Sequence, residues 1–439
     1  MGCCMAFRRD IAIRSFANNR IAIPHDTWIA LVACHKFKSK YSIKMFSEAV
    51  KNKLSCAAFF FLPGLSYSLV TSRMPAIKES AQIDDLQLGI ALFCLGIAGC
   101  IGLFFSSRLV RLLKDRPTIA AGASLSTIGL VIAGYANSFA SLVSGFAAIG
   151  FGIGLTDALM NAQGMFYERL YKTRSMNLFH AFFSLGGIVG SLTASLCAYL
   201  DLSPLFSFLV LVVPWTVVCL FGCRYLQEED RQVASSETSR VNTTKRAYPL
   251  ILICFGLLSW LAYDIEGSVA EWGSVYMVSS KESDQAVAAL VYGLFSGTIF
   301  IVRLFGDKLR ESVGDFRLLP ICSLIVFCGM SFVLSSAGPA TALCGYVVMG
   351  LGLAPVVPTI FSLARKCKGI TASEASSFIA IVAYGGLLVV PPTLGWIASH
   401  SSLGTALCLV LVFCALAFVI SLILPRLKDQ LNLSGSLEP

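Results

Sequence analysis

Long apolar segments recur along the chain, and short polar segments separate them. Each apolar segment is close to the length at which an α-helix crosses the hydrocarbon core of a bilayer, about twenty residues. The pattern predicts an all-α membrane protein with twelve transmembrane helices. We expect the spans at roughly 54–72, 86–106, 118–136, 140–163, 177–199, 204–225, 249–277, 286–306, 318–336, 339–363, 374–398 and 403–424.

One polar segment, 226–248, is much longer than the others and divides the spans into two groups of six. Its charged and hydroxyl residues are typical of a solvated linker. The sequence thus predicts an N-terminal six-helix bundle at 54–225 and a C-terminal bundle at 249–424. The flanking segments are a basic N-terminal tail, 1–53, which we expect to be disordered or weakly amphipathic at the membrane surface, and a short tail, 425–439.

Lys and Arg residues indicate which side of the membrane each connection faces. All but three of the 34 lie in the terminal segments, in alternate connections or at the span ends beside them, and the exceptions are Arg73, Lys78 and Lys281. Cytoplasmic connections are enriched in Lys and Arg, so we expect the linker and both termini to be cytoplasmic. Met45 is an alternative start within the N-terminal tail.

The two groups of spans are related to each other in sequence. FHAFFSLGG at 179–187 and FIAIVAYGG at 378–386 share the pattern F-x-A-x-x-x-x-G-G. Further matches at nearly the same separation are Gly150 and Gly152 with Gly350 and Gly352, and Arg108-Leu109 with Arg303-Leu304. These matches predict a duplicated six-helix unit, and hence two pseudo-symmetric bundles. Parallel repeats about an axis along the membrane normal form one known transporter architecture.

Composition agrees with a membrane protein and narrows the function. The chain is 56% hydrophobic and 13% charged, whereas soluble domains are about 45–50% apolar and about 25% charged. The net charge of +9 comes from connections that orient helices, so we expect no nucleic-acid partner. Most of the 16 cysteines lie in apolar runs, where they act as small hydrophobes.

The chain lacks the sequence signatures of enzymes. It contains no C-x-x-C, no Walker A sequence, no H-E-x-x-H and no G-x-S-x-G. The sequence therefore contains none of these motifs for a metal site, ATP-driven transport or hydrolysis. We expect no catalytic residues, no metal and no cofactor. Secondary transport across a lipid bilayer remains, and we expect a monomer with a small solute as its partner.

One stretch of the second half resembles the signature loop of the major facilitator superfamily. The sequence GTIFIVRLFGDKLRESVGDFR carries Gly306-Asp307, Arg310, Gly314 and Arg317 in the family's pattern. The first-half copy is degenerate, with Arg111 in place of the usual Asp and Lys114 in place of the usual Gly. The resemblance implies that an Asp and basic residues hold helix ends together on the cytoplasmic side. We assign gating to Arg303, Asp307 and Arg310.

Several further stretches resemble the fucose-permease-like branch of that superfamily and its uncharacterised bacterial inner-membrane subgroup. They are SRMPAIKE at 72–79, TDALMNAQG at 156–164, NLFHAFFSLGG at 177–187, EGSVAEWGSVYM at 266–277 and GLGLAPVVPTIFS at 350–362. The resemblance implies two rocking bundles around a central cavity. It also implies proton-coupled transport of a small solute, such as a sugar or a related metabolite, across the inner membrane.

Asp157 is an acid inside the apolar fourth span. A charge at the bilayer centre costs about 2.5–3.5 kcal/mol on insertion scales, so such a residue faces a cavity, a partner or a proton. Gly150, Gly154, Asp157 and Asn161 share one helical face, as in a helix that lines a cavity or packs closely on a neighbour. Asp157 is either a proton-coupling group or a structural carboxyl. The resemblance favours proton coupling, because an acid four residues before an Asn occupies this place in related symporters.

The remaining candidates come from the fifth and seventh spans. In the seventh, Glu266 is a second proton-coupling candidate, and Asp264 is a weaker one on the opposite side of the helix. In the fifth, His180 is either a proton relay or an interfacial residue. We assign solute binding to Asn161, Gln163, His180 and Phe183. Sugar-carrying relatives have Gln and Asn where this chain has His180 and Phe183, and this departure argues against a sugar.

Three residues are candidates for an external gate. Arg73 ends the first span, where it either pairs with an acid or is a simple helix-end cation. Glu271 and Trp272 lie near the external end of the seventh span, as a gate or as an interfacial anchor. Two other functions stay open for the whole chain. One is a drug or metabolite efflux antiporter with an aromatic cavity containing Phe179, Phe182 and Phe183, and the other is a membrane receptor or sensor without transport.

Overall fold

The computed structural model describes residues 25–173, 175–227 and 248–432. The chain divides into two compact units, Met1–Asn52 and Lys53–Pro439. Within the described ranges the regular structure is helical, apart from an isolated bridge between Cys367 and Leu431. The predicted linker, 226–248, lies almost entirely outside these ranges.

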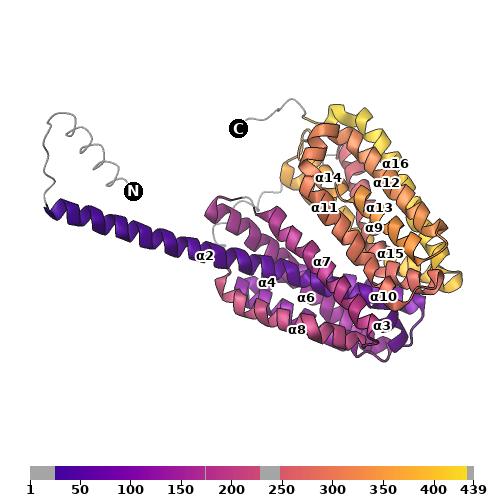
Figure 1. The fold of residues 1–439 in the computed structure, drawn as a ribbon. Coiled ribbons are helices and arrows are strands. Elements are labelled where there is room, and N and C mark those ends of the chain that lie inside the picture. Colours follow the sequence, from indigo (N-terminus) through magenta and orange to yellow (C-terminus); the bar gives the residue numbers. More distant parts are fainter. Residues whose placement is uncertain (1–24, 174, 228–247, 433–439) are drawn as a thin grey trace. The chain divides into compact units, whose positions relative to one another are not determined.

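Twelve of the described helices are long and apolar enough to cross a membrane, which confirms the predicted number of spans. Figure 1 shows them as a helical assembly without a sheet. The helices of the N-terminal half are α2 (His25–Ser72), α3 (Met74–Ser80), α4 (Asp85–Leu113), α5 (Asp115–Gly134), α6 (Phe139–Tyr171), α7 (Met176–Tyr199) and α8 (Pro204–Gly222). Those of the C-terminal half are α9 (Leu250–Lys281), α10 (Gln285–Ala288), α11 (Leu290–Val313), α12 (Asp315–Ser335), α13 (Pro339–Leu353), α14 (Val356–Ala364), α15 (Ala372–His400) and α16 (Leu403–Ile423).

The structure describes part of the predicted N-terminal tail. Of the predicted tail 1–53, the structure describes 25–53, and these residues belong to α2, which continues into the first span at Ser47–Ser72. No Gly or Pro interrupts the sequence between His25 and Leu62. Extending an existing helix costs far less than starting one, so the formed span supports helix toward its N-terminal side.

Proline has different effects in two spans of the second half. The tenth span breaks into α13 and α14 at Pro355, because proline has no amide hydrogen and its ring clashes with the preceding turn. The eleventh span, α15, stays helical through Pro391 and Pro392. In α15 the two prolines remove amide donors from a continuous helix.

Glycines bring the backbones of neighbouring helices together in the same way in both halves. A Cβ on Gly152 in α6 would lie 2.5 Å from the Gly122 carbonyl oxygen in α5. A Cβ on Gly352 in α13 would lie 2.5 Å from the Cys322 carbonyl oxygen in α12. Gly129–Gly145 and Gly329–Gly345 form a second such pair of contacts. The α5–α6 contact thus recurs as the α12–α13 contact two hundred residues later, in agreement with the duplication read from the sequence.

The connections between spans lie at two opposite ends of the helices. We call one end the short-loop face, formed by residues 73–84, 135–138, 200–203, 282–289, 336–338 and 401–402. The other end is the basic face, formed by the described residues 114, 172–173, 175, 223–227, 248–249, 314 and 365–371, and it carries most of the Lys and Arg of the described connections.

The two halves meet toward the short-loop face. Ser274 Oγ on α9 donates to the Thr71 carbonyl oxygen at 2.6 Å, and Ser191 Oγ on α7 donates to the Ala289 carbonyl oxygen at 2.6 Å. Gly89 near the start of α4 lies against the backbone of α15 at Pro391. These contacts join the halves at the end of the helices that carries the fewest basic residues.

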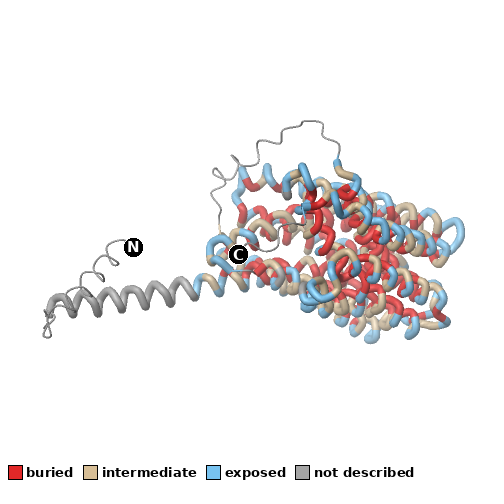
Figure 2. Tube along the Cα trace, turned by 90° about the horizontal axis from the view of Figure 1, so that it is seen from above, coloured by how far each residue is buried: buried red, intermediate tan, exposed pale blue. Residues whose placement is uncertain are grey.

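The outer surface is largely apolar. Figure 2 shows buried residues through the interior of the unit Lys53–Pro439 and exposed residues on its outside. Many of the exposed side chains are large and apolar, including Phe104, Leu192, Phe221 and Leu304. An apolar exterior of this kind fits lipid rather than water.

The last described residues pack on the basic face. A 3-10 helix, Leu424–Gln430, follows α16, and the Gln430 side chain accepts a hydrogen bond from the Ile251 amide at 3.0 Å. The amide of Lys368 donates to the Gln430 carbonyl oxygen at 3.0 Å. This part of the predicted C-terminal tail is therefore attached to α9 and to the α14–α15 connection.

Candidate functional site

Asp157 and Asn161 form a polar pair on α6. Asn161 Nδ2 donates to the Asp157 carbonyl oxygen at 2.9 Å and lies 3.4 Å from Asp157 Oδ1. Both residues are partly buried. Gly150 and Gly154, on the same helical face, leave room only for the backbone of α4. The glycine part of this face therefore packs against a helix, and the Asp157–Asn161 part carries the polar chemistry.

A second polar cluster includes side chains from both halves. The rings of Tyr67 on α2 and Tyr292 on α11 meet edge to face, with centroids 5.5 Å apart. Glu266 on α9 is close enough to both tyrosines and to Arg303 on α11 for electrostatic interaction. Arg303 also interacts electrostatically with His180 on α7. We call these five residues the central cluster.

Burial differs across the central cluster. Tyr292 is buried, Tyr67 and Glu266 are partly buried, and His180 and Arg303 are exposed. The His180 ring packs edge-on against Phe60 at 5.1 Å. The cluster thus combines a carboxyl group, a guanidinium group and three hydrogen-bonding rings, with His180 and Arg303 accessible. A carboxylate and a guanidinium at one place can bind a polar solute from two sides.

Three assignments made from the sequence change with the structure. Gln163 is 2% exposed, so it is not accessible to a solute. Its Nε2 donates to Asp115 Oδ2 at 3.0 Å and to the Gln227 carbonyl oxygen at 2.6 Å, and its Oε1 accepts from the Gln227 amide at 3.1 Å. Gln163 is therefore a structural link between α6, the start of α5 and the end of the first bundle.

The second change concerns Arg303, which we expected among the gating residues of the basic face. It lies instead in the central cluster, about one helical turn before Asp307 on α11. A helix rises about 1.5 Å per residue, and this separation is enough to move the guanidinium from the loop toward the bilayer interior. Asp307 belongs to α11, but its side chain lies outside the described residues.

The third change concerns Trp272, for which an interfacial anchor was one reading. Its side chain is fully buried, with no surface left for a membrane interface. Glu271 beside it is partly buried. A gate role for the two stays a prediction.

Arg73 lies in the contact region of the halves at the short-loop face. It is 4% exposed, and Nη2 donates to the Leu202 carbonyl oxygen at 2.5 Å. Burial lowers the pKa of its guanidinium from the usual value. It also lines a cavity of about 660 Å³, together with Asp201, Asp284 and Gln285. Arg73 is thus not a solvated helix-end cation, and its burial between the halves is compatible with a gate.

Phe183 and Arg310 lie on different helices toward the basic face. Phe183 is partly buried, and its carbonyl group fills the space beside Gly64, which holds α7 closely against α2. Arg310 forms a two-pronged ion pair with Asp315, at 2.9 and 3.1 Å. This pair joins the end of α11 to the start of α12, and it agrees with a role in holding helix ends.

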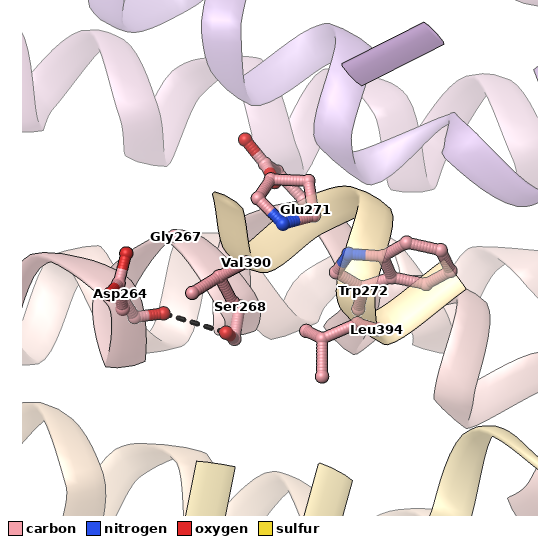
Figure 3. A pocket seen from close by; sticks show the side chains of 8 residues that line it. Asp264, Gly267, Ser268, Glu271, Trp272, Val390 and Leu394 are labelled. Carbon is pink, nitrogen blue, oxygen red and sulfur yellow. Dashed lines mark hydrogen bonds between the residues drawn. The ribbon is translucent and has the colours of Figure 1, made fainter. Parts of the chain in front are cut away.

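Sequence reasoning missed Tyr67 and Tyr292 and gave Asp264 little weight. The two tyrosines lie in apolar helices, and buried Tyr hydroxyls normally require a hydrogen-bond partner. This need for a partner was the signal in the sequence that could have identified the two tyrosines. Asp264 does lie on the opposite side of α9 from Glu266, toward α15, where Figure 3 shows it beside a small pocket.

Comparisons with known proteins agree with this fold. Residues 56–369 match the family model of the Major Facilitator Superfamily. An uncharacterised MFS-type transporter of Yersinia pestis is 26% identical over 369 residues, which cover 83% of this chain and 94% of that one.

Solved structures show the same architecture. The crystal structure of the nucleoside transporter NupG superposes with a TM-score of 0.67 at 13% identity, covering 86% of this chain and 99% of that chain. The crystal structure of a D-xylose-proton symporter does so with a TM-score of 0.67 at 13% identity, covering 88% and 99%. The fucose-permease-like branch stays a prediction. The chain belongs to the major facilitator superfamily, as a membrane transporter and not an enzyme.

Proposed function

We propose that this chain is a proton-coupled secondary transporter of a small polar solute. It acts as a monomer in a bacterial inner membrane, with both termini in the cytoplasm. The solute binds between the two halves, and the halves expose the site to each side of the membrane in turn. The central cluster is the observation that carries this proposal.

The central cluster supports solute binding because its residues come from both halves. Tyr67 and His180 belong to the first half, and Glu266, Tyr292 and Arg303 to the second. Charged side chains within spans are expensive and generally face a cavity or one another. A solute held by both sets of residues would favour one relative placement of the halves over another, as alternating access requires.

Two acids are the proposed proton carriers. Asp157 is partly buried. Among the described residues, its carboxyl group has a hydrogen bond only with Asn161. Glu266 interacts with Arg303, so loss or gain of its proton would change how strongly the cation is held. Coupling follows if solute binding and proton binding at these groups alter each other.

The lining supports a polar solute over a drug-like one. The central cluster offers hydroxyl, imidazole, guanidinium and carboxylate groups, which suit hydroxylated or zwitterionic compounds. Phe179, one of the aromatic residues that would favour an efflux antiporter, is fully buried and stacks on Phe60 at 5.5 Å. Two structural neighbours are a nucleoside transporter and a xylose–proton symporter, so sugars and nucleosides are the first solutes to test.

The contacts between the halves support a particular orientation. Hydrogen bonds from Ser274 and Ser191 hold the halves together toward the short-loop face. His180 and Arg303 are exposed on the other side of these contacts. With the basic face in the cytoplasm, this arrangement is closed to the outside and open to the inside, and Arg73 lies in the closed gate.

Flux measurements in proteoliposomes test this proposal. Purified protein is reconstituted with a pH-sensitive dye inside, and sugars, sugar acids and nucleosides are added one at a time. We expect at least one compound to cause proton movement, and an imposed pH gradient to drive its accumulation. Asp157→Asn should reduce solute-driven proton flux at least tenfold while leaving solute exchange measurable, because the amide cannot carry a proton.

Glu311→Gln is the matched control, since it makes the same acid-to-amide change at an exposed site on the basic face. It should behave like the wild type. Normal proton flux in both Asp157→Asn and Glu266→Gln would contradict proton coupling at these acids. Binding of a solute without any flux would favour the receptor alternative.

A further inference from the structure

A small cavity between α9 and α15 contains a buried acid without a hydrogen-bond partner. Asp264 is 1% exposed, and neither of its carboxyl oxygens has a partner among the described atoms. The cavity is about 10 Å³, close to the space of one water molecule. An ionised carboxylate in such a place would lose several kcal/mol of solvation without compensation. A proton on Asp264 removes this cost.

A second acid lines the same cavity. Glu271 lies seven residues, or two helical turns, after Asp264, so both side chains project from one side of α9. Figure 3 shows the two with Ser268 and Trp272 around the pocket, and the Ser268 hydroxyl donates to the Asp264 carbonyl oxygen at 2.6 Å. The two carboxyl groups also interact electrostatically. Two like charges at one site do not both ionise readily.

The opposite wall offers acceptors for a protonated carboxyl. Pro391 lines the cavity from α15 and is followed by Pro392. Neither proline has an amide hydrogen, so two carbonyl groups of the preceding turn lose their usual donor. Gly386, also on α15, has no side chain because Trp260 and Asp264 occupy that space. Asp264 therefore lies directly against the α15 backbone, beside the Trp260 indole nitrogen, which also has no hydrogen-bond partner among the described atoms.

The charged surroundings offer no partner of opposite sign. From α2, Tyr67 interacts with Glu271, and on α9 itself Glu266 faces Arg303 in the central cluster. The described side chains of α15 and α16 at this place are apolar, namely Val390, Leu394 and Phe413. At the nearby end of α4, Asp85 is already paired with Lys78. Among the described residues, no cation therefore lies at this cavity to pair with the two acids.

We propose that Asp264 and Glu271 form a second proton-binding site at the α9–α15 contact, outside the central cluster. The occupant is a proton rather than a metal ion, because the cavity has the size of one water and the described residues contain no group of three acidic, His or Cys ligands. Glu271 lies one turn before Ser274, whose hydroxyl holds Thr71 of the other half. The pair of acids therefore lies next to the contact that closes the short-loop face.

Infrared difference spectroscopy tests the site without any solute. Protein in lipid vesicles is moved between acidic and alkaline buffer, and the C=O band of protonated carboxyl groups is followed. We expect Asp264→Asn and Glu271→Gln each to remove one component of this band. In each single variant the remaining acid should titrate in one step, because the wild-type groups titrate as a pair.

Controls separate this site from the proposed transport. Asp157→Asn and Glu266→Gln should keep the two components, so failure of solute-driven flux would leave the result intact. Thermal melting checks that each variant is folded, and one folded variant is enough to decide. Unchanged carboxyl bands in a folded Asp264→Asn or Glu271→Gln protein would overturn the proposal.

Discussion

The α4–α5 and α11–α12 connections occupy equivalent places in the two halves but are stabilised differently. In the second half, Gly314 has φ +84°, and Arg310 binds Asp315 across the turn. In the first half, Lys114 has φ +68° and ψ 175°, a conformation that is essentially restricted to glycine. Asp115, which matches Asp315, accepts a hydrogen bond from Gln163.

This difference shows that geometry can persist where sequence has diverged. Lys114 keeps the backbone conformation of a turn whose usual residue is glycine, at a cost of about 1–3 kcal/mol for such strain. Buried hydrogen bonds through Gln163 offset that cost, whereas the second half uses an ion pair at its surface. The sequence of the first-half loop departs from the family's pattern, but the loop is therefore still held in a defined conformation.

Of the changes that test this comparison, removal of the Gln163 amide should lower the free energy of unfolding most. Gln163→Leu leaves the buried Asp115 carboxyl group and the Gln227 backbone with lost partners. We expect a loss of about 3 kcal/mol, since each hydrogen bond contributes about 0.5–1.5 kcal/mol and one to a charged group about 1.5–3 kcal/mol. Unfolding in detergent measures the change. A melting temperature equal to that of the wild type would show that these hydrogen bonds do not stabilise the first-half loop.

Exchange of the two turn residues should give smaller effects of opposite sign. Lys114→Gly relieves strain but makes the unfolded chain more flexible, so we expect a net gain of about 1 kcal/mol. Gly314→Ala puts a Cβ at positive φ and should lose about 1 kcal/mol. The same unfolding assay measures both variants. Destabilisation by Lys114→Gly would mean that the lysine side chain contributes more than its backbone strain costs.

Loss of the ion pair should have the smallest effect. Arg310 and Asp315 are partly exposed, with about one fifth of each side chain accessible, and exposed pairs contribute about 0.2–1 kcal/mol. Arg310→Gln should therefore lower stability by about 0.5 kcal/mol and the effect should shrink in high salt. Asp315→Asn combined with Arg310→Gln should cost no more than either change alone. Additive losses would show that the two side chains act separately.

Much of the fold could be predicted from the sequence because bilayer crossing depends on local composition. Segment length and apolarity determine the spans, and the repeated glycines pointed to the duplicated helix contacts. These features depend on residues close together in the chain.

The candidate site was harder to predict because it depends on contacts between distant segments. Gln163 was predicted to bind the solute, but in the fold its side chain forms hydrogen bonds with Asp115 and Gln227. Tyr67 and Tyr292 are separated by about half of the chain, yet their rings meet. Hydrophobic periodicity identifies which side of a helix is polar, but not which helix faces it.

The glycine contacts have a mechanical consequence for motion between the halves. Where backbone touches backbone, no side chain can change rotamer to absorb movement, so α5 with α6 and α12 with α13 act as stiff lever arms. At 33 residues, α6 is roughly 50 Å long at 1.5 Å per residue. Tilting a lever of that length by about 10° carries its far end through roughly 9 Å. In the proposed alternation between two states, a slight loosening at one membrane surface would be amplified into an opening wide enough for a small molecule at the other.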